Sequence, residues 1–396
     1  MPFSHPTFDV IVVGARCGGA TTAMLLARLG HDVALIDRAQ LPTDTVSTSA
    51  LARGGVVQLR RWGLLGAVLE AGAPPIRRVS FSSPGGAVTR TIKRSAGVEH
   101  LLAPRRDLLD GVLLDAAVRA GARLRTGTMV SGLLRDDTGR VTGVRTRTRA
   151  GAEQSLSARL VIGADGVRSR VARAVGAAAA NESTSGAGTF YASFAGLADD
   201  RFEFHVSDRA LAGVFPRAAD EACVWISSPA GDSAALRAAG ADKVSALIAL
   251  IEAGAPELAR RLRRCRPVSG VRGAMNLPNA IRRPAGPGWA LVGDAGYHRD
   301  PVTGHGMTDA FRDAELLARA ADGWLRDGAS EGEAMATYAE QRDGAIRPIV
   351  DLTCALAAFP GVDRFVELQK QLSDALEREA RWLADLPALA PDPVAA

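Results

Sequence analysis

The chain has 396 residues, of which 47% are hydrophobic and 23% charged, so it is long and apolar enough to bury a large core. The formal net charge of +5 comes almost entirely from arginine, because Lys93, Lys243 and Lys370 are the only lysines. These arginines are spread among acids, which argues against a nucleic-acid-binding protein. No apolar run is long enough to span a membrane.

The N-terminal sequence MPFSHPTFDVIVVG has neither the basic start nor the apolar length of a signal peptide. The cysteines at 17, 223, 265 and 354 stand singly, which favours buried thiols in a reducing compartment over disulfides or metal ligands. We therefore expect a cytoplasmic protein with no bound metal.

The start of the chain predicts a strand, a glycine turn and a helix. Phe8–Val13 is a continuous apolar run typical of a buried parallel strand, and Ala20–Leu29 has helical periodicity. A second buried strand, Val33–Ile36, ends at Asp37. The helix N-terminus would bind a pyrophosphate, and the acid would accept hydrogen bonds from ribose hydroxyls.

The glycine turn departs from the usual dinucleotide pattern at one place. Gly14 stands 23 positions before Asp37, close to the ~20 expected between the turn and the ribose acid. A complete G-x-G-x-x-G pattern would place glycines at 14, 16 and 19, and position 16 is Arg16. That arginine must swing aside, or lie along the phosphates and add positive charge.

Two later segments repeat the order of strand, turn and helix. Leu160–Ile162 is a short apolar strand, residues 163–166 (Gly-Ala-Asp-Gly) form the turn, and a helix is expected from Val167. Trp289–Val292 is the strand of the last unit, followed by GDAGYHRDPVTGHG and by a helix over Gly306–Ala320. This stretch places an acid, a proline and bare glycine backbone in one turn.

Together the three motifs resemble the FAD-dependent class A monooxygenases of the para-hydroxybenzoate hydroxylase type. That family has a glycine-rich fingerprint, a mid-chain Asp-Gly motif and a late Gly-Asp motif followed by Pro-x-x-G-x-G. Here they occur in that order at 14–37, 163–169 and 293–306, with Arg16 and His305 as departures. The resemblance implies an α/β fold, in which a Rossmann-like FAD-binding domain is interleaved with a mixed β-sheet substrate domain and followed by C-terminal helices.

The implied domains are interleaved along the chain. The discontinuous FAD-binding domain covers residues 1–75, 101–178 and 282–325, and the substrate-binding sheet domain covers 76–100 and 179–281. The C-terminal helical segment, 326–396, would either pack on the core or pair two subunits in a homodimer.

By the resemblance, Asp294 bonds the ribityl chain of FAD, and Pro301 turns the chain beneath the isoalloxazine. Gly304 and Gly306 would bring backbone N–H groups to the N1–C2=O side of the ring, where a helix N-terminus stabilises negative charge. The expected cofactor residues are Gly14, Arg16, Gly18, Gly19, Asp37, Arg38, Arg53, Arg106, Asp165, Gly293, Asp294, Pro301, Gly304, Gly306 and Met307.

Three of these residues rest on weaker matches. The segment ALARGGVV makes Arg53 the match for a family arginine that meets the FAD phosphates. The segment APRRDLLDGVLLDAA makes Arg106 the match for a second arginine, with Arg105 as a rival. Asp165 is expected to organise the nearby arginines by charge pairing.

Strand-like runs between the motifs predict the sheet that roofs the flavin, with a hairpin turning at residues 84–86. Aromatic side chains of this sheet are candidates for the substrate pocket: Tyr191, Phe204 or His205, Phe215 and Trp225. Beside the Gly-Asp motif, Tyr297, His298 and His305 are the candidate catalytic residues, and either histidine could act as acid or base.

The resemblance implies an FAD monooxygenase that uses NADPH or NADH and O2. Through a flavin C4a-hydroperoxide it would hydroxylate or epoxidise a small organic substrate, an aromatic or polyketide-like compound of secondary metabolism. A separate flavin reductase is an alternative source of reduced flavin. Other functions remain open: a reductase of C=C bonds similar to geranylgeranyl reductases, a flavin-dependent halogenase, or a non-enzymatic flavin-binding regulator. A halogenase is a poorer match, since VWISSP has one tryptophan and Lys93 is the only lysine before residue 243.

Overall fold

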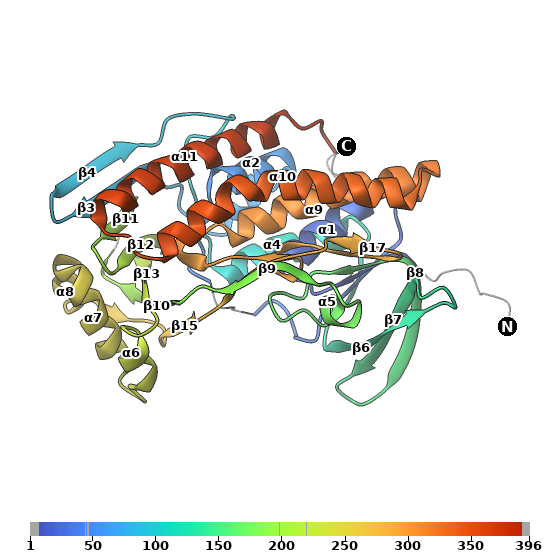
Figure 1. Cartoon of the computed structure of the whole chain (residues 1–396), viewed down its shortest axis with the longest axis horizontal. Helices are drawn as coiled ribbons and strands as arrows, with labels where there is room; N and C mark the ends of the chain where they lie inside the picture. The colour runs from blue at the N-terminus through green and yellow to red at the C-terminus, as the bar shows by residue number, and fades with distance from the viewer. Residues whose placement is uncertain (1–7, 44, 46, 198, 219, 390–396) are drawn as a thin grey trace.

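A parallel sheet carries the three motifs (Figure 1). The computed structural model describes residues 8–43, 45, 47–197, 199–218 and 220–389. Five parallel strands of this first sheet lie in the order β18-β8-β1-β2-β5, and the short β17 pairs antiparallel with β18. Their bounds are β1 (Phe8–Val13), β2 (Val33–Ile36), β5 (Arg123–Arg125), β8 (Glu153–Gly163), β17 (Ala285–Gly286) and β18 (Trp289–Leu291). The expected Rossmann-like order of strand, glycine turn and helix is confirmed.

Different layers cover the two faces of the first sheet. Helices pack on one face through apolar side chains such as Met24, Leu113 and Phe311. On the other face β8 continues into an antiparallel ribbon with β7 and β6, and a second apolar cluster fills the space between. These elements are α1 (Cys17–Arg28), α4 (Arg106–Arg119), α9 (Gly306–Asp327), β6 (Thr128–Arg135) and β7 (Val141–Thr148).

A second, mixed sheet stands beside the first. Its strands run in the order β14-β10-β13-β12-β11-β3-β4, with β15 paired to β10, and only β11 and β3 are parallel. The strands are β3 (Arg78–Ser83), β4 (Gly86–Thr91), β10 (Ala187–Ala195), β11 (Arg201–Val206), β12 (Leu211–Ala218), β13 (Glu221–Pro229), β14 (Arg266–Pro267) and β15 (Arg272–Met275). The expected mixed sheet and its first hairpin are confirmed.

Alternation along these strands gives the second sheet two apolar faces. Its outer face packs on three helices, α6 (Ala234–Ala238), α7 (Lys243–Gly254) and α8 (Pro256–Leu262). Its inner face carries Tyr191, Phe215 and Trp225 and packs on Val302 of the last motif and on the C-terminal helices. The second sheet therefore contacts the last motif turn directly.

Short elements connect the two sheets. A three-stranded sheet in the order β19-β16-β9 links the last motif to the region after the Asp-Gly motif. The connecting elements are β9 (Ala179–Thr184), β16 (Pro278–Arg282), β19 (Tyr297–His298), α2 (Arg53–Arg61), α3 (Leu65–Glu70), α5 (Arg170–Ala174) and the 3-10 turns η1 (Gly293–Ala295) and η2 (Pro301–Thr303). The helix expected from Val167 begins later, at Arg170, because Ser169 caps it there.

The C-terminal segment forms two long helices that pack on the core (Figure 1). They are α10 (Glu331–Ala357) and α11 (Val362–Asp385). α10 places the buried Tyr338 against the layer that covers the first sheet, and α11 places Phe365, Leu368 and Leu372 against the inner face of the second sheet. The C-terminal helices thus bridge the motif-bearing sheet and its roof.

Among the residues that the structure describes, no helix has an apolar stretch long enough to cross a membrane. In the same residues, no group of three or more His, Cys, Asp or Glu side chains is arranged to hold a metal ion. Residues 1–7, part of the stretch on which the signal-peptide interpretation depends, lie outside the described part of the chain.

Candidate functional site

The three motif turns meet at one edge of the first sheet. β1, β8 and β18 are parallel neighbours, so the turns after their carboxyl ends lie side by side. A Cβ atom on Gly14, whose φ is +100°, would lie 2.5 Å from the carbonyl oxygen of Ala164 in the second motif. A Cβ on Gly18 would lie 3.5 Å from Ala310 Cβ in α9, and one on Gly19 would lie 1.7 Å from the Gly14 oxygen. The close approach of the first and second motif backbones requires glycine at 14, and the tight turn from Gly14 into α1 requires glycine at 19.

Asp37 stands at the end of β2 and faces the glycine turn. Its two carboxylate oxygens accept hydrogen bonds from the backbone N–H groups of Ala15 and Ala39, each at 2.8 Å. The structure therefore brings the predicted ribose acid to the turn. Arg38, the next residue, is exposed.

Arg16 lies immediately before α1, at the place where a family glycine is usual. Its Nη2 atom donates to Thr43 Oγ1 at 3.0 Å, and its buried Nη1 atom has no partner among the described residues. No side chain caps the N-terminus of α1. A free guanidinium nitrogen and the first N–H groups of α1 thus lie together at the glycine turn.

Arg106 lies between the first and last motifs. Its Nη2 atom donates to both carboxylate oxygens of Asp110 at 3.0 Å, and the thiol of Cys17 donates to the same carboxylate at 3.1 Å. The Nε atom of Arg106 is buried without a partner among the described residues, and the positive charge of Arg106 opposes the rise in the pKa of Asp294. Arg105, the rival by sequence, is exposed. The structure brings Arg106, and not Arg105, to the motif turns.

Arg53 is directed elsewhere. Its Nη1 atom donates to the carbonyl oxygen of Val98 at 2.6 Å, and its Nη2 atom donates to that of Lys93 at 2.9 Å. Its Nε atom lies 3.0 Å from a carboxylate oxygen of Glu377 in α11. The loop over residues 93–98 and α11 therefore occupy all three guanidinium nitrogens, and the structure does not bring Arg53 together with the motif residues.

Asp165 caps a helix and forms no ion pair with an arginine. Its carboxylate accepts hydrogen bonds from the Ser169 hydroxyl and from the backbone N–H of Arg170, the latter at 2.6 Å. No ion pair of Asp165 is present among the described residues. The expectation that it organises the arginines by charge pairing is corrected, because the N–H groups at the start of α5 satisfy the carboxylate.

Asp294 is a partly buried acid whose carboxylate has no hydrogen-bond partner among the described residues. Burial raises its pKa, Asp309 adds to that rise, and the charges of His298 and Arg106 oppose it. One carboxylate oxygen lies 3.9 Å from where a Cβ of Gly306 would be. An unpartnered acid therefore lies against the bare start of α9.

The Pro-x-x-Gly-x-Gly turn exposes backbone and polar atoms at the N-terminus of α9. Gly304 is left-handed with a φ of +67°, and Gly306 is the first residue of the helix, followed by the buried Met307. The Nδ1 atom of His305 and the Oγ1 atom of Thr303 are buried without partners among the described residues. Burial lowers the pKa of His305 to about 4, so its ring is neutral at pH 7.

The predicted aromatic residues gather on the inner face of the second sheet. Phe215 and Trp225 have ring centroids 5.4 Å apart, and Phe204 meets Trp225 edge to face at 6.1 Å. The Tyr191 hydroxyl accepts the backbone N–H of Ser47 at 2.9 Å. This face, together with Val302, forms an apolar roof above the last motif turn.

His205 points away from this roof. Its Nε2 atom lies 3.2 Å from a carboxylate oxygen of Glu203, which also accepts from Arg261 at 2.6 Å. Glu203 and His205 share the opposite face of β11, because side chains alternate along a strand. Of the two alternatives that the sequence left open, the structure places Phe204 at the roof.

Tyr297 and His298 lie on β19, close to the Gly-Asp motif. The His298 Nδ1 atom lies 2.6 Å from the carbonyl oxygen of Pro278, so a main-chain contact holds the ring. The Tyr297 hydroxyl is buried and has no partner among the described residues. Of the three candidate catalytic residues, His305 is nearest in sequence to the start of α9, with its Nδ1 atom free.

Comparison with known proteins agrees with this arrangement. Residues 7–253 match the family model described as FAD binding domain, and residues 273–361 match the model described as squalene epoxidase. The chain belongs to the FAD-binding family of para-hydroxybenzoate hydroxylase-like flavoproteins.

Curated relatives fall into two groups by name. A digeranylgeranylglycerophospholipid reductase of Methanocella arvoryzae is 27% identical over 85% of this chain and 83% of its own. A second, from Methanothrix thermoacetophila, is 30% identical over 77% of this chain and 75% of its own. Aklavinone 12-hydroxylase DnrF of Streptomyces peucetius is 29% identical over 44% of this chain and 39% of its own.

Solved structures share the fold. A triple mutant of the flavin-dependent brominase Bmp2 superposes with a TM-score of 0.81 at 18% identity, over 96% of this chain and 95% of its own. The protein pqsL of Pseudomonas aeruginosa, a probable FAD-dependent monooxygenase, has a TM-score of 0.78 at 24% identity, over 92% and 99%.

The residues at the motif turns fit FAD. The glycine turn offers helix N–H groups, Arg16 Nη1 and Arg106 Nε to a pyrophosphate, and Asp37 stands where a ribose would lie. The last turn offers the unpartnered Asp294 carboxylate to the ribityl hydroxyls. Since buried polar atoms without partners are rare in folded proteins, their grouping at the predicted cofactor turns is the pattern expected of a ligand site.

Sequence reasoning missed Arg217, a buried cation on the roof. Its Nη1 atom donates to Ser193 Oγ at 3.0 Å and its Nη2 atom donates to Ser49 Oγ at 2.9 Å, while Nε is buried without a partner among the described residues. Among the residues that the structure describes, its one ion pair is a long one, with the Glu221 carboxylate at 4.0 Å. Its partner Ser193 lies two residues from Tyr191 on β10, which places the Arg217 guanidinium at the inner face. Alternation along β12 could not have given this, because the register shifts between Pro216 and Ala218.

Arg217 is also close to the last motif. Ser49 adopts a positive φ of 69°, which is uncommon for a residue other than glycine, and its hydrogen bond to Arg217 holds that conformation. The following residue, Ala50, has its Cβ 3.5 Å from where a Cβ of Gly304 would be. Arg217 therefore contacts Ser49, and the next residue, Ala50, lies against Gly304 in the turn that would hold the flavin ring.

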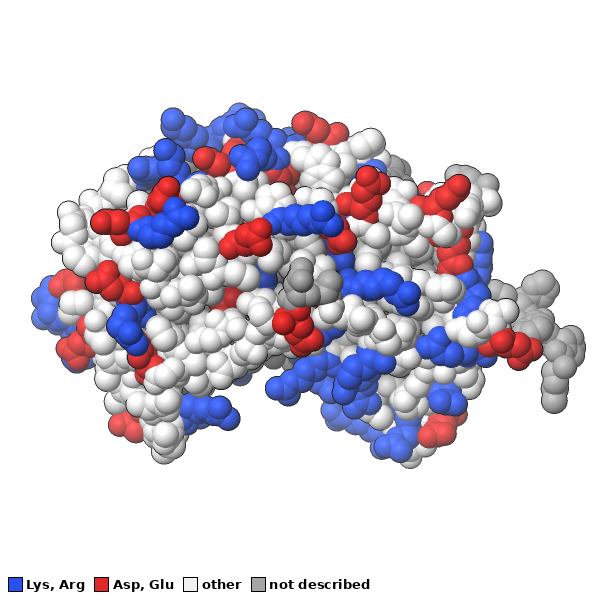
Figure 2. Space-filling model, viewed as in Figure 1, with Lys and Arg blue, Asp and Glu red and all other residues white. Residues whose placement is uncertain are grey.

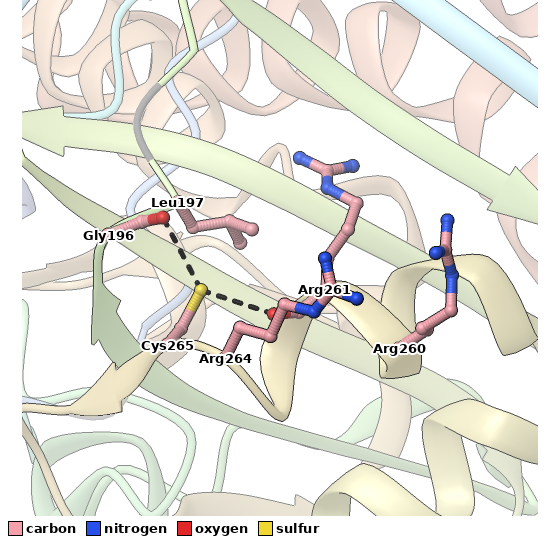
Figure 3. A pocket seen from close by; sticks show the side chains of 6 residues that line it. All are labelled: Gly196, Leu197, Arg260, Arg261, Arg264 and Cys265. Carbon is pink, nitrogen blue, oxygen red and sulfur yellow. Dashed lines mark hydrogen bonds between the residues drawn. The ribbon is translucent and has the colours of Figure 1, made fainter.

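Two surface hollows of about 330 Å³ each lie outside the motif turns. One, on the outer face of the second sheet, contains Arg260 and Arg261 (Figure 3). These two arginines pair with Glu257 and Glu203 respectively. Cys265 there contacts two backbone carbonyl oxygens at 3.4 Å (Figure 3). Two of the three arginines that line this hollow are therefore paired with acids, and Arg264 is the third.

The other hollow lies beside the Asp-Gly motif. It is lined by Arg168, Arg173 and Arg282 among other residues, and none of the lining residues is an acid. Figure 2 shows basic side chains gathered over α5 and β6 at the lower edge of the molecule. Arg282 Nη1 also lies 3.3 Å from the carbonyl oxygen of Ala295, next to the last motif. This hollow has the charge of an anion-binding surface.

Proposed function

We propose that the protein is an FAD-dependent monooxygenase that hydroxylates or epoxidises a small aromatic or polyketide-like substrate with an acidic or phenolic group. The observation that carries the proposal is Arg217, a buried cation whose nearest carboxylate among the described residues is 4.0 Å away. It lies on an aromatic face beside the last motif, residues 293–306. Electrophilic oxygen transfer requires an electron-rich substrate, and phenols and aromatic acids are held by donors of this kind.

Two similarities support oxygen transfer. Residues 273–361 match a model described as squalene epoxidase, and the partial relative DnrF is named as a hydroxylase. A bound FAD, once reduced, would supply the oxygen chemistry by reaction with O2. The remaining work is done by the protein's own residues.

The roles of those residues follow from their positions. Arg217 would bind the acidic group and orient the ring, and Phe215 and Trp225 would exclude water from the reacting centre. His305, neutral at pH 7, would accept a proton at its free Nδ1 atom. The N-terminus of α9 would stabilise negative charge on the cofactor.

We also propose a nicotinamide nucleotide as reductant. The hollow lined by Arg168, Arg173 and Arg282 has the charge to bind its phosphates. Anaerobic mixing of the FAD-loaded protein with NADPH, and separately with NADH, tests this by loss of the oxidised flavin band. Bleaching would identify a self-sufficient enzyme and its reductant, and absence of bleaching, with or without an aromatic acid, would favour a separate flavin reductase.

The second candidate is a reductase of C=C bonds, favoured by the relatives that cover most of the chain and are named digeranylgeranylglycerophospholipid reductases. Turnover under ¹⁸O2 distinguishes the two reactions. A product that carries one ¹⁸O atom supports the monooxygenase, and oxygen-independent saturation of a double bond would contradict it and support the reductase. A flavin-dependent halogenase is less well supported, because Lys93 is exposed on the loop after the hairpin.

A further inference from the structure

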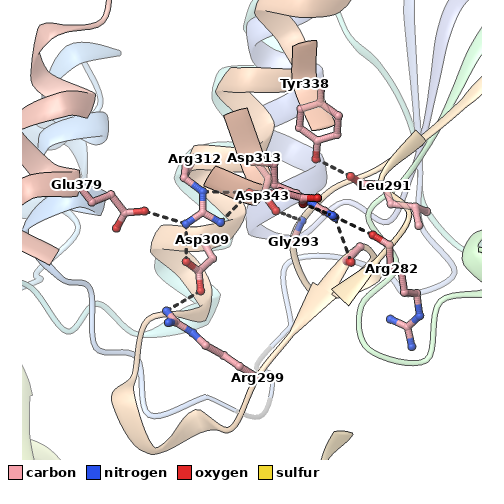
Figure 4. Close-up of polar contacts among 12 residues, drawn as sticks. Arg282, Leu291, Gly293, Arg299, Asp309, Arg312, Asp313, Tyr338, Asp343 and Glu379 are labelled. Carbon is pink, nitrogen blue, oxygen red and sulfur yellow. Dashed lines mark hydrogen bonds and ion pairs between the residues drawn. The ribbon is translucent and has the colours of Figure 1, made fainter. Parts of the chain in front are cut away.

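A series of buried ion pairs connects α11 to the flavin turn, that is, to the last motif over residues 293–306 (Figure 4). Arg299 donates to Asp309 at 2.8 Å, and Arg312 donates to Asp309, Asp313 and Glu379, each at 2.8 Å. All five side chains are buried. Buried charges are costly unless paired, so such a cluster points to a role for its position.

At one end of this series of ion pairs, Asp313 contacts the Gly-Asp motif. Asp313 Oδ2 accepts the backbone N–H of Gly293 at 3.1 Å, which fixes the first residue of the Gly-Asp motif. Asp309 lies in the first turn of α9 and, with Asp313, raises the pKa of Asp294. The cluster therefore acts on both the backbone and the electrostatics of the flavin turn.

At the other end of the series of ion pairs is Glu379, which lies on the buried apolar stripe of α11. Phe365, Leu368, Leu372 and Ala375 occupy the other positions of this stripe, and helical spacing would favour another apolar residue at 379. Space around Glu379 is limited, since one of its oxygens lies 4.0 Å from where a Cβ of Gly54 would be. An acid on the apolar stripe, directed at Arg312, requires an explanation beyond packing.

We propose that Glu379 is a positioning residue of the flavin site. Through Arg312 it orients Asp309 and Asp313, and so it sets the charge at the N-terminus of α9 and the placement of the Gly293 amide. Within these five buried side chains, two arginines face three carboxylates, and Arg342 adds a positive charge near Asp313. Replacing Glu379 with glutamine removes one negative charge with little change in volume, so negative charge on the reduced flavin becomes less unfavourable.

The test is the reduction potential of the bound flavin, measured against a reference dye in the FAD-loaded full chain. We expect Glu379→Gln to shift the potential to more positive values, and Glu379→Asp, which keeps the charge, to stay closer to wild type. Glu367→Gln is the matched control, because Glu367 is an exposed acid on the same helix, paired with Arg364. We expect it to have the wild-type potential.

The pH profile separates an electrostatic role from a merely structural one. Burial raises the pKa of Glu379 and the charge of Arg312 opposes that rise; Asp309, Asp313 and Arg299 are the other charged groups of the cluster that faces it. A protonated Glu379 resembles glutamine, so the difference in potential between wild type and Glu379→Gln should shrink as pH falls through this pKa.

Two outcomes would overturn the proposal. One is a folded, flavin-bound Glu379→Gln protein whose potential equals that of wild type at neutral pH. The other applies if Glu379→Gln does not retain FAD, in which case the dissociation constant of FAD is measured for Glu379→Asp. A larger dissociation constant than those of wild type and Glu367→Gln supports the proposal, and an equal one overturns it.

Discussion

Replacing Arg217 with methionine should separate substrate binding from stability. Arg217 is 6% exposed, and its guanidinium has two serine hydroxyls as partners. Among the described residues, its nearest carboxylate is 4.0 Å away. Loss of a charged partner from a desolvated site costs about 2–5 kcal/mol of binding. The dissociation constant of an aromatic carboxylate should therefore rise by about thirtyfold to several thousandfold, at about 1.4 kcal/mol per factor of ten.

Folding stability should respond differently. Removing one partner of a close buried ion pair costs about 3–5 kcal/mol, because the other charge remains buried and unpaired. Removing Arg217 leaves the Glu221 carboxylate, which is 4.0 Å away and 25% exposed, so that it stays partly hydrated; methionine fills a volume similar to that of arginine. We expect the free energy of unfolding to stay within about 1 kcal/mol of wild type.

The assay is a titration of the oxidised holoenzyme with benzoate and with its neutral analogue benzamide, followed by the visible spectrum of the flavin. Urea denaturation of each variant gives the free energy of unfolding. Arg209→Met is the control, since Arg209 is 70% exposed and pairs with Asp232 at the surface. Tight benzoate binding by Arg217→Met, or equal binding of benzoate and benzamide by wild type, would refute the reasoning.

Three more predictions address the cofactor turn and the roof. Asp294→Ala should lose FAD during purification, and a fully yellow variant would contradict the assignment of Asp294. The free energy of unfolding should fall as pH drops from about 6.5 towards 4, because the pKa of His305 is lowered in the folded state; urea denaturation of His305→Gln should show a smaller fall. Gly213→Ala should keep FAD but weaken binding of aromatic acids, since the new Cβ would lie 2.5 Å from the Trp225 ring; Gly231→Ala, which meets no atom within 4 Å, is the control.

The cofactor turns could be predicted from sequence because the backbone dictates their residues. Gly14 has a φ of +100°, and a Cβ atom there would lie 2.5 Å from a neighbouring carbonyl oxygen. Only glycine fits, so the sequence itself marks this position. Asp37 and Asp294 follow buried strands, whose lengths fix where the acids emerge. Local backbone geometry and strand length therefore allow the residues of the motif turns to be predicted from the sequence.

Long side chains could not be placed in the same way. Arg53 was expected at the phosphates, but its partners are backbone carbonyls of a loop about 40 residues away and Glu377, more than 300 residues away. An arginine side chain reaches whichever acceptor the tertiary fold supplies, and sequence spacing does not report it. Glu379 escaped notice for the same reason, because its partner Arg312 is 67 residues away.

The reaction depends on a part of the protein that the family motifs do not specify. The three turns would hold the cofactor, and relatives named as a hydroxylase and as reductases both share sequence with this chain. What differs between such reactions is the surface presented to the substrate, here the alternate side chains of β10, β12 and β13. A buried arginine on that face favours a substrate with an anionic group, because its desolvation costs free energy unless an anion binds it. A buried cation with only a long ion pair among the described residues therefore indicates an anionic group on the substrate. The titration of Arg217→Met with benzoate and benzamide tests that argument.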